Sequence, residues 1–218
     1  MGLDFTIVPP YFNILLLGAM WTLFLTVLSI IFSLLLGTLF AVIQLSRYRF
    51  LRLPTRFFVW LFMGTPLLLQ VYLIYFGLVQ IGIDFNAFTA GVIALSLHFA
   101  VYNSDIIRSG IAAVDKGQFE AARSLGLNHL QTMRKVVLPP ALHMVTPALG
   151  NMMIALLKET SLISIIGVME LTLSAQRAIS DTFRPFEFYM AAAAIYYIFN
   201  LILDKTTKTV EVRSAKYR

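Results

Sequence analysis

Cysteine is absent from the 218 residues of this chain, and charged side chains make up only 13% of it. The missing thiols exclude disulfides, cysteine nucleophiles and thiolate metal sites. A soluble domain is usually about half apolar and about a quarter charged, whereas this chain is 59% hydrophobic, with a mean hydropathy of +0.80. The composition therefore predicts an integral membrane protein.

Motifs for phosphate binding and for hydrolysis are missing as well. The chain has no Gly-x-x-x-x-Gly-Lys-Ser/Thr sequence, so it cannot hold ATP phosphates in a P-loop. Neither His-Glu-x-x-His nor Gly-x-Ser-x-Gly occurs, and the three histidines lie far apart in the sequence. We therefore expect no catalytic residue, no metal site and no cofactor bound by this chain.

Apolar segments make up most of the chain. Each can cross a hydrocarbon core of about 30 Å, which takes about 20 helical residues. We predict an all-α membrane domain over residues 11–204 with about five transmembrane helices, an external segment at 1–10 and a cytoplasmic tail at 205–218. The apolar segments are residues 11–45, 57–81, 88–114, 141–173 and 186–203.

Lysine and arginine are unevenly distributed between these segments. None occurs before Arg47, so the N-terminus lacks the basic region of a signal peptide and the first span is expected to be retained. The second loop has none, and the fourth has only Arg177 and Arg184. The positive-inside rule then predicts the N-terminus outside and the C-terminus inside. The formal charge of +6 thus reflects topology, and we expect no nucleic-acid partner. The basic residues on the predicted cytoplasmic side are Arg47, Arg49, Arg52, Arg56, Lys116, Arg123, Arg134, Lys135, Lys205, Lys208, Arg213, Lys216 and Arg218.

Small residues recur along one face of the first span, at intervals of three or four. In lipid, such a face lets two helices approach closely. We predict that it packs against another span or a partner permease, the alternative being that these residues are only compatible with a helix. They are Gly18, Thr22, Thr26, Ser29, Ser33 and Gly37.

Polar residues at membrane depth mark the second and third spans. Residues 64–66, Gly-Thr-Pro, are expected to kink the second span. Gln70 follows at membrane depth and is a candidate for the substrate pathway.

In the third span His98, Tyr102 and Asp105 share one helical face, beside Asn103. Ionisable groups in a membrane usually face a cavity or one another. Asp105 either pairs with Arg108 or lines a pathway. For His98 we favour hydrogen-bonded packing over ligand binding. Tyr102, Asn103 and Asp105 are pathway candidates.

A charged, hydroxyl-rich sequence, Lys158-Glu159-Thr160-Ser161, interrupts the fourth segment. A discontinuous helix that lines a site near the midplane has this pattern. On that interpretation Glu159, Thr160 and Ser161 line the substrate pathway, and Glu159 faces a substrate cation. The alternative is that Lys158 and Glu159 mark the outer end of the span.

The most specific signal is the polar loop at about 115–139, between the third and fourth spans. Residues 118–125 favour a short helix that Gly126 ends. Asn128 can cap a second helix, which a proline pair ends. The loop has a Glu-Ala-Ala triplet, three residues, a glycine, nine residues, an aliphatic, any residue, then Leu-Pro. These positions are Glu120, Ala121, Ala122, Gly126, Val136, Leu138 and Pro139.

This spacing resembles the EAA loop of permease subunits in ABC importers. The resemblance implies the type I importer permease fold and a cytoplasmic coupling helix, Glu120–Gly126, that docks on an ATPase subunit. An ordinary amphipathic helix lying on the membrane is the alternative.

Four other stretches resemble permeases that import polar amino acids: residues 64–77, 102–110, 149–151 and 158–162. The pattern departs at Met63, where arginine is usual, and at Asp105, which replaces glutamate. The resemblance implies an importer of polar amino acids, including cationic ones, in a prokaryotic cytoplasmic membrane.

The resemblance also implies the partners. They are two ATP-binding cassette subunits, which hold the ATP and Mg, and a second permease copy, identical or a sister chain. An external solute-binding protein is expected to dock on residues 166–187. The alternatives are a type I permease for another small solute, a stand-alone ion-coupled carrier or channel using Asp105 and Glu159, and a non-transporting scaffold.

Overall fold

The computed structural model describes the backbone of residues 2–215 and the side chains of residues 2–212. All regular elements in this part of the chain are helical. Four helices are long and apolar enough to cross a membrane, and a sharply bent pair brings the number to five. The expected all-helical membrane architecture is therefore confirmed. The four spans are Phe5–Leu45, Ala87–Ala112, His129–Ile166 and Pro185–Val212, and the bent pair is Arg49–Met63 with Leu67–Ile81.

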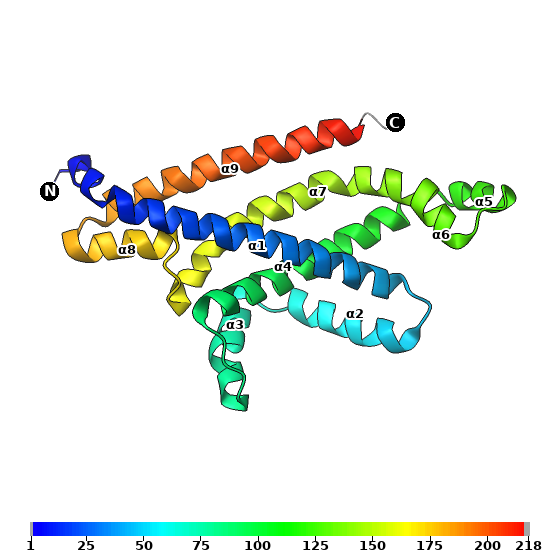
Figure 1. The fold of residues 1–218 in the computed structure, drawn as a ribbon, viewed down its shortest axis with the longest axis horizontal. Coiled ribbons are helices and arrows are strands. Elements are labelled where there is room, and N and C mark those ends of the chain that lie inside the picture. The colour runs from blue at the N-terminus through cyan, green and yellow to red at the C-terminus, as the bar shows by residue number, and fades with distance from the viewer. Residues whose placement is uncertain (1, 216–218) are drawn as a thin grey trace.

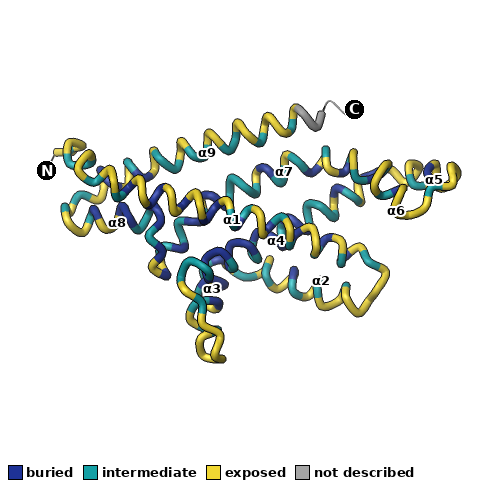
Figure 2. Tube along the Cα trace, in the orientation of Figure 1, coloured by how far each residue is buried: buried dark blue, intermediate teal, exposed yellow. Residues whose placement is uncertain are grey.

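Four long helices form the body of the molecule (Figure 1). They are α1 (Phe12–Leu45), α4 (Ala87–Ala112), α7 (Leu138–Glu159) and α9 (Pro185–Ala215). Helix α4 packs against both α1 and α7, and α9 packs against α7 and α8 (Leu171–Thr182). Buried residues concentrate where α1, α3 and α4 meet, whereas much of α9 is exposed (Figure 2).

The small-residue face of α1 is a packing face, as predicted, because all six of its residues are buried. A Cβ atom on Gly37 would lie 2.8 Å from Cβ of Asn103 and 2.9 Å from the carbonyl oxygen of Ala100, both on α4. A Cβ atom on Gly18 would collide with Ser174 of α8. Glycine at these two positions allows the backbone of α1 to approach α4 and α8 this closely.

The second span is broken rather than kinked. Helix α2 (Arg49–Met63) and the helical stretch Leu67–Ile81 meet at a bend of 112°. Pro66 adopts an extended conformation and precedes α3 (Leu67–Tyr72), which continues as a π turn and a 3-10 turn. Proline lacks the amide hydrogen that would continue the helix of α2. The arm that begins with α3 therefore points away from the four long helices (Figure 1).

Helix α2 begins at Arg49, before the expected residue 57, and the last two spans end at residues other than those expected. Helix α7 ends at Glu159, a 3-10 helix covers Thr160–Ile166, and Gly167 turns the chain with a left-handed φ of 91°. The span expected to reach residue 173 therefore stops short of it. Helix α9 continues past residue 204 to Ala215, with an ion pair between Asp204 and Lys208. Of the predicted cytoplasmic basic residues, the side chains of Arg213, Lys216 and Arg218 lie outside the described part.

Different segments of the chain lie at the two ends of the molecule (Figure 1). The N-terminal turns, α8 and the start of α9 lie at one end. The beginning of α2, the helices α5 (Lys116–Ser124) and α6 (His129–Thr132), and the end of α9 lie at the other. The segments rich in lysine and arginine thus share one end, as the predicted topology requires. Which end faces the cytoplasm stays a prediction.

Candidate functional site

Gln70 joins the broken span to α4. Its Nε2 donates to the carbonyl oxygens of Phe62, at 2.8 Å, and Thr65, at 3.1 Å, and lies 2.8 Å from Oγ1 of Thr65. Its Oε1 lies 3.0 Å from Nδ1 of His98. The His98 ring in turn packs against Tyr102, with ring centroids 5.2 Å apart. Three residues of the sequence analysis therefore come together here, and His98 has the hydrogen-bonded role favoured for it.

Asn103 points to a different neighbour. It is buried, and its Nδ2 donates to Oγ of Ser33 on α1 at 3.3 Å. At the next residue of α4, Oγ of Ser104 accepts from Nε2 of Gln44 on α1 at 3.2 Å. These bonds tie α1 to α4 in the structure. A pathway role for Asn103 stays a prediction.

Asp105 forms an ion pair with Arg108 on the next turn of α4. The carboxylate side chain is 45% exposed and the guanidinium side chain 37%. Because both side chains are partly exposed to solvent, the carboxylate of Asp105 can still contact other groups. The ion pair is therefore compatible with a pathway role for Asp105. That role stays a prediction.

The polar break of the fourth segment lies at the junction of α7 with its 3-10 extension. Thr160 is fully buried, and its hydroxyl donates to the carbonyl oxygen of Leu157 at 2.7 Å. The hydroxyl of Ser161 donates to the carbonyl oxygen of Lys158 at 2.8 Å. Glu159 is only partly buried. Among the hydrogen bonds and ion pairs of the described residues, none joins Glu159 to α3 or α4.

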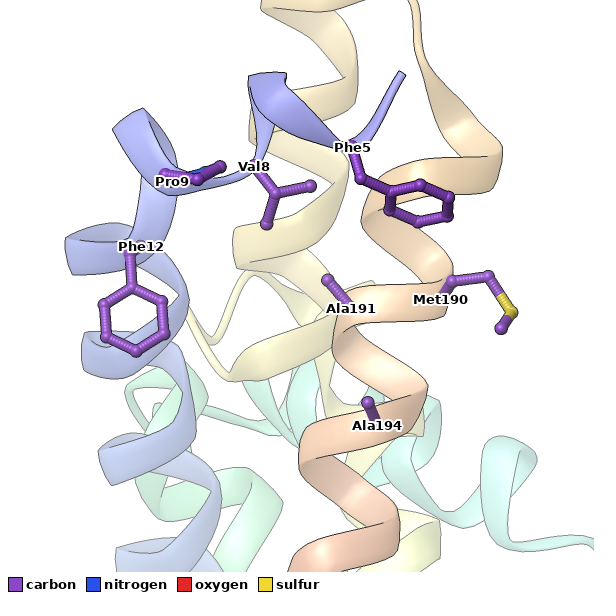
Figure 3. A pocket seen from close by; sticks show the side chains of 7 residues that line it. All are labelled: Phe5, Val8, Pro9, Phe12, Met190, Ala191 and Ala194. Carbon is purple, nitrogen blue, oxygen red and sulfur yellow. The ribbon is translucent and has the colours of Figure 1, made fainter. Parts of the chain in front are cut away.

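Among the hollows that α9 helps to line, two lie near residues of the sequence analysis or near the N-terminal segment. One, of about 570 Å³, lies against the break and is lined by Lys158, Ser161, Tyr196 and Asn200 among others. It therefore offers both cationic and hydroxyl groups. The other, of about 670 Å³, lies between the N-terminal segment and the start of α9 (Figure 3). Its lining is apolar throughout, so it provides no group for a polar substrate.

Glu170 is a buried carboxylate that the sequence did not single out. It accepts bonds from the amides of Thr172 and Leu173, at 2.9 and 2.8 Å, and from the phenol of Tyr196 at 2.7 Å. Burial raises the pKa of this carboxyl, and the hydrogen bonds oppose that rise. Glu170 caps α8 and links it to α9. Its position directly before a helix was the available signal, although glutamate is not a preferred cap.

The surface at residues 166–187, where we expect the solute-binding protein to dock, has fewer exposed charges than the sequence suggests, because Glu170 is buried. Glu187 is also buried, and its Oε1 accepts from the amide of Asp4 at 3.1 Å. The charged residues still exposed between these two glutamates are Arg177 and Asp181 on α8.

The loop at 115–139 folds on a small apolar core of its own. Buried Val114, Val137 and Ala141 pack with partly buried neighbours that include Phe119. Asp115 caps α5 by accepting from the amide of Gly117 at 2.6 Å. The second helix begins with the predicted cap, because Asn128 and Gln131 form a reciprocal capping box.

The residues of the Glu-Ala-Ala motif differ in how far they are exposed on the loop at 115–139. Ala122 is buried, whereas Glu120 and Ala121 are exposed on α5. Gly126 has a φ of 75°, which favours glycine, and ends the helix as predicted. Leu138 and Pro139 begin α7, and the chain is helical without a gap from His129 to Glu159. The expectation that the proline pair ends the second helix is therefore wrong, because prolines are tolerated in the first turn of α7. Leu125 and Leu130 are also 80% and 76% exposed, so both are available for contact with another protein.

Within residues 2–212, no group of three or more His, Cys, Asp or Glu residues is placed to hold a metal ion.

Comparison with known proteins gives consistent matches over nearly the whole chain. The family described as "Binding-protein-dependent transport system inner membrane component" matches residues 33–213. The arginine transport system permease protein of Bacillus subtilis is 39% identical over 212 residues, 97% of each chain. A permease protein of Rickettsia conorii, named provisionally for a glutamine transport system, is 40% identical over 195 residues, 89% of each chain. A crystal structure of an amino acid ABC transporter with histidines superposes with a TM-score of 0.92 at 42% identity, over 98% of this chain and 100% of that one.

Proposed function

The chain belongs to the family of binding-protein-dependent transport system inner membrane components, and from that premise we propose that it imports polar amino acids, including cationic ones. It is the multi-pass permease subunit of a bacterial ABC importer and not itself an ATPase. The observation that carries the cargo assignment is the near-full-length similarity to permeases named for arginine and for glutamine.

The coupling surface is the exposed face of α5 with the turn that follows it. Glu120 offers a carboxylate, and the exposed Leu125 and Leu130 offer apolar anchors that an ATPase groove would cover. The core under α5 fixes their positions, so a movement of the ATPase subunit is passed to α4 and α7. Two ATPase subunits, which hold the ATP and Mg, serve two permease copies. A solute-binding protein docks on the exposed face of α8.

The cargo pathway runs along the polar residues of α3, α4 and the end of α7. Asp105 and Glu159 are the carboxylates that face a cationic substrate, and Gln70, Tyr102, Asn103, Thr160 and Ser161 are the neutral polar groups. Thr160 and Asn103 are buried against their own helices or against α1, so any contact with cargo requires these helices to move apart. Alternating access between two conformations provides such a movement.

The first test measures ATPase coupling in native membranes. A tagged chain is purified in mild detergent, and ATP hydrolysis is assayed beside the variant Glu120→Lys. We expect an ATPase subunit to co-purify with the wild type and to be lost or uncoupled in the variant, while membrane insertion is unchanged. Uptake by the chain alone in ATP-free vesicles would instead favour an ion-coupled carrier that uses Asp105 and Glu159.

The second test concerns the charge of the cargo. Glu159→Gln keeps the shape of the side chain and removes its charge. We expect arginine uptake to fall by about tenfold, which corresponds to roughly 1.4 kcal/mol of lost charge–charge interaction. The matched control is Asp84→Asn, which removes an exposed carboxylate from the loop before α4. Equal arginine uptake by both variants would remove Glu159 from the pathway without affecting the coupling assignment.

A further inference from the structure

Four arginines gather where α2 begins. Arg49, Arg52 and Arg56 are spaced by three and four residues, so they lie above one another on one face of the helix, and Arg47 stands in the preceding turn. Arg47, Arg49 and Arg56 are exposed, and Arg52 is partly exposed. We call these four residues the arginine stripe.

Within the described residues, no carboxylate forms an ion pair with the arginine stripe. Neither aspartate nor glutamate occurs between Asp4 and Asp84 in the sequence. The ion pairs of the described residues join other groups. Arg47 lies 5.4 Å from the centre of the Tyr48 ring, and Nε of Arg52 is buried with no hydrogen-bond acceptor in the described part. Four guanidinium groups are therefore left to an external anion.

An exposed apolar face adjoins the arginine stripe on the same helix. Phe50, Phe57 and Trp60 are 85%, 62% and 70% exposed. Val59, on another side of α2, is buried, and Phe58 packs on Phe40 of α1 with ring centroids 5.5 Å apart. Helix α2 thus has a side that packs on the protein, a cationic side and an aromatic side. Basic residues at the beginning of a span, followed by exposed aromatic residues, are the pattern of a helix end at the membrane interface.

We propose that the arginine stripe binds the phosphate groups of anionic phospholipids, while Phe50, Phe57 and Trp60 enter the acyl region beside them. A guanidinium group suits this role because it can donate two parallel hydrogen bonds to one phosphate. The occupant is lipid because the aromatic side is continuous with the cationic side, so both are covered together by a headgroup and its chains. This assignment does not depend on which solute is carried.

The test uses the two tryptophans of the chain, Trp21 and Trp60, as reporters. In a Trp21→Phe background, Trp60 fluorescence is measured in vesicles of phosphatidylcholine and phosphatidylglycerol, with one or the other lipid brominated in its acyl chains. The quenching gives the relative binding constant of the two lipids beside α2. We expect phosphatidylglycerol to bind about fivefold tighter or more, because each basic residue near an anionic surface adds about fivefold.

Four comparisons make the test specific. The binding preference for phosphatidylglycerol should fall to about one when all four residues of the arginine stripe, Arg47, Arg49, Arg52 and Arg56, become glutamine, and it should persist when the same residues become lysine. Added salt should weaken it in the unmodified chain, which needs no folding control. Trp60→Phe leaves Trp21, on the part of α1 near the opposite end, where no preference is expected. Equal binding of both lipids at Trp60, or a preference that survives in the glutamine variant, would overturn the proposal. Loss of an ATPase subunit from that variant with an unchanged lipid preference would assign the arginine stripe to a protein instead.

Discussion

At the scale of single residues, Gln70 explains how a membrane helix can break without leaving its backbone unsatisfied. The last carbonyl groups of a helix have no partner within it, and in hydrocarbon each unsatisfied group is costly. The side chain of Gln70 supplies donors to the carbonyl oxygens of Phe62 and Thr65, and His98 holds its other end. Gln70 therefore positions the bend between α2 and α3, whether or not it also meets cargo.

Replacing this side chain should destabilise the protein. We expect Gln70→Leu to lower the free energy of unfolding by about 1–3 kcal/mol, the cost of leaving buried polar groups without partners. Thermal unfolding in detergent measures the effect. Gln80→Leu makes the same chemical change at an exposed residue of the arm, and it should leave the unfolding temperature nearly unchanged. Equal unfolding temperatures for the two variants would show that Gln70 does not support the bend.

At the scale of elements, the loop at 115–139 combines a rigid base with an exposed tip. Its helices are capped at Asp115 and Asn128, and its core holds α5 against the beginning of α7. Gly126 lies at the tip with a left-handed backbone and open space around it. A side chain there would alter the turn through backbone strain, not through collision.

We accordingly expect Gly126→Val to reduce ATP-driven uptake by about tenfold or more. A left-handed conformation costs a residue with a side chain roughly 1–2 kcal/mol, and a branched one more, so the turn would rearrange and displace Leu125. Uptake and ATP hydrolysis are measured in proteoliposomes with the ATPase subunit. Gly82→Val is the matched control, because Gly82 has a φ of 84° and equally open surroundings in another loop. A similar loss of uptake in both variants would point to general strain instead of coupling.

At the scale of the whole molecule, the distribution of charge agrees with the arrangement of the helices. The basic loop before α2, the loop at 115–139 and the end of α9 lie at one end, whereas α8 lies at the other (Figure 1). Segments far apart in the sequence are thus found on the same side of the molecule. One orientation in the membrane satisfies the positive-inside rule for all of them.

The absence of cysteine allows a direct test of this orientation. Ser124→Cys and Ser180→Cys each introduce a single thiol, at exposed positions on α5 and α8. In intact cells, a membrane-impermeant maleimide should label Ser180→Cys and should reach Ser124→Cys only after the membrane is opened. The reverse pattern would invert the topology and place the coupling loop outside.

The sequence by itself determined the class of the protein, its all-helical architecture and the position of the polar loop at 115–139 between two spans. These depend on length, hydropathy, charge and local spacing, which act over a few turns of one helix. The small-residue face of α1 could also be predicted, because its spacing repeats with the helical period.

Only the tertiary structure decided where polar side chains point and how the broken elements continue. The sequence placed Gln70, Asn103 and Thr160 at membrane depth, yet each proves to be bonded to backbone or to a neighbouring helix. The burial of Glu170 beneath Tyr196 of α9 likewise depends on a partner remote in the sequence. In lipid a polar group must be satisfied within the protein, and packing between helices determines which partner satisfies it.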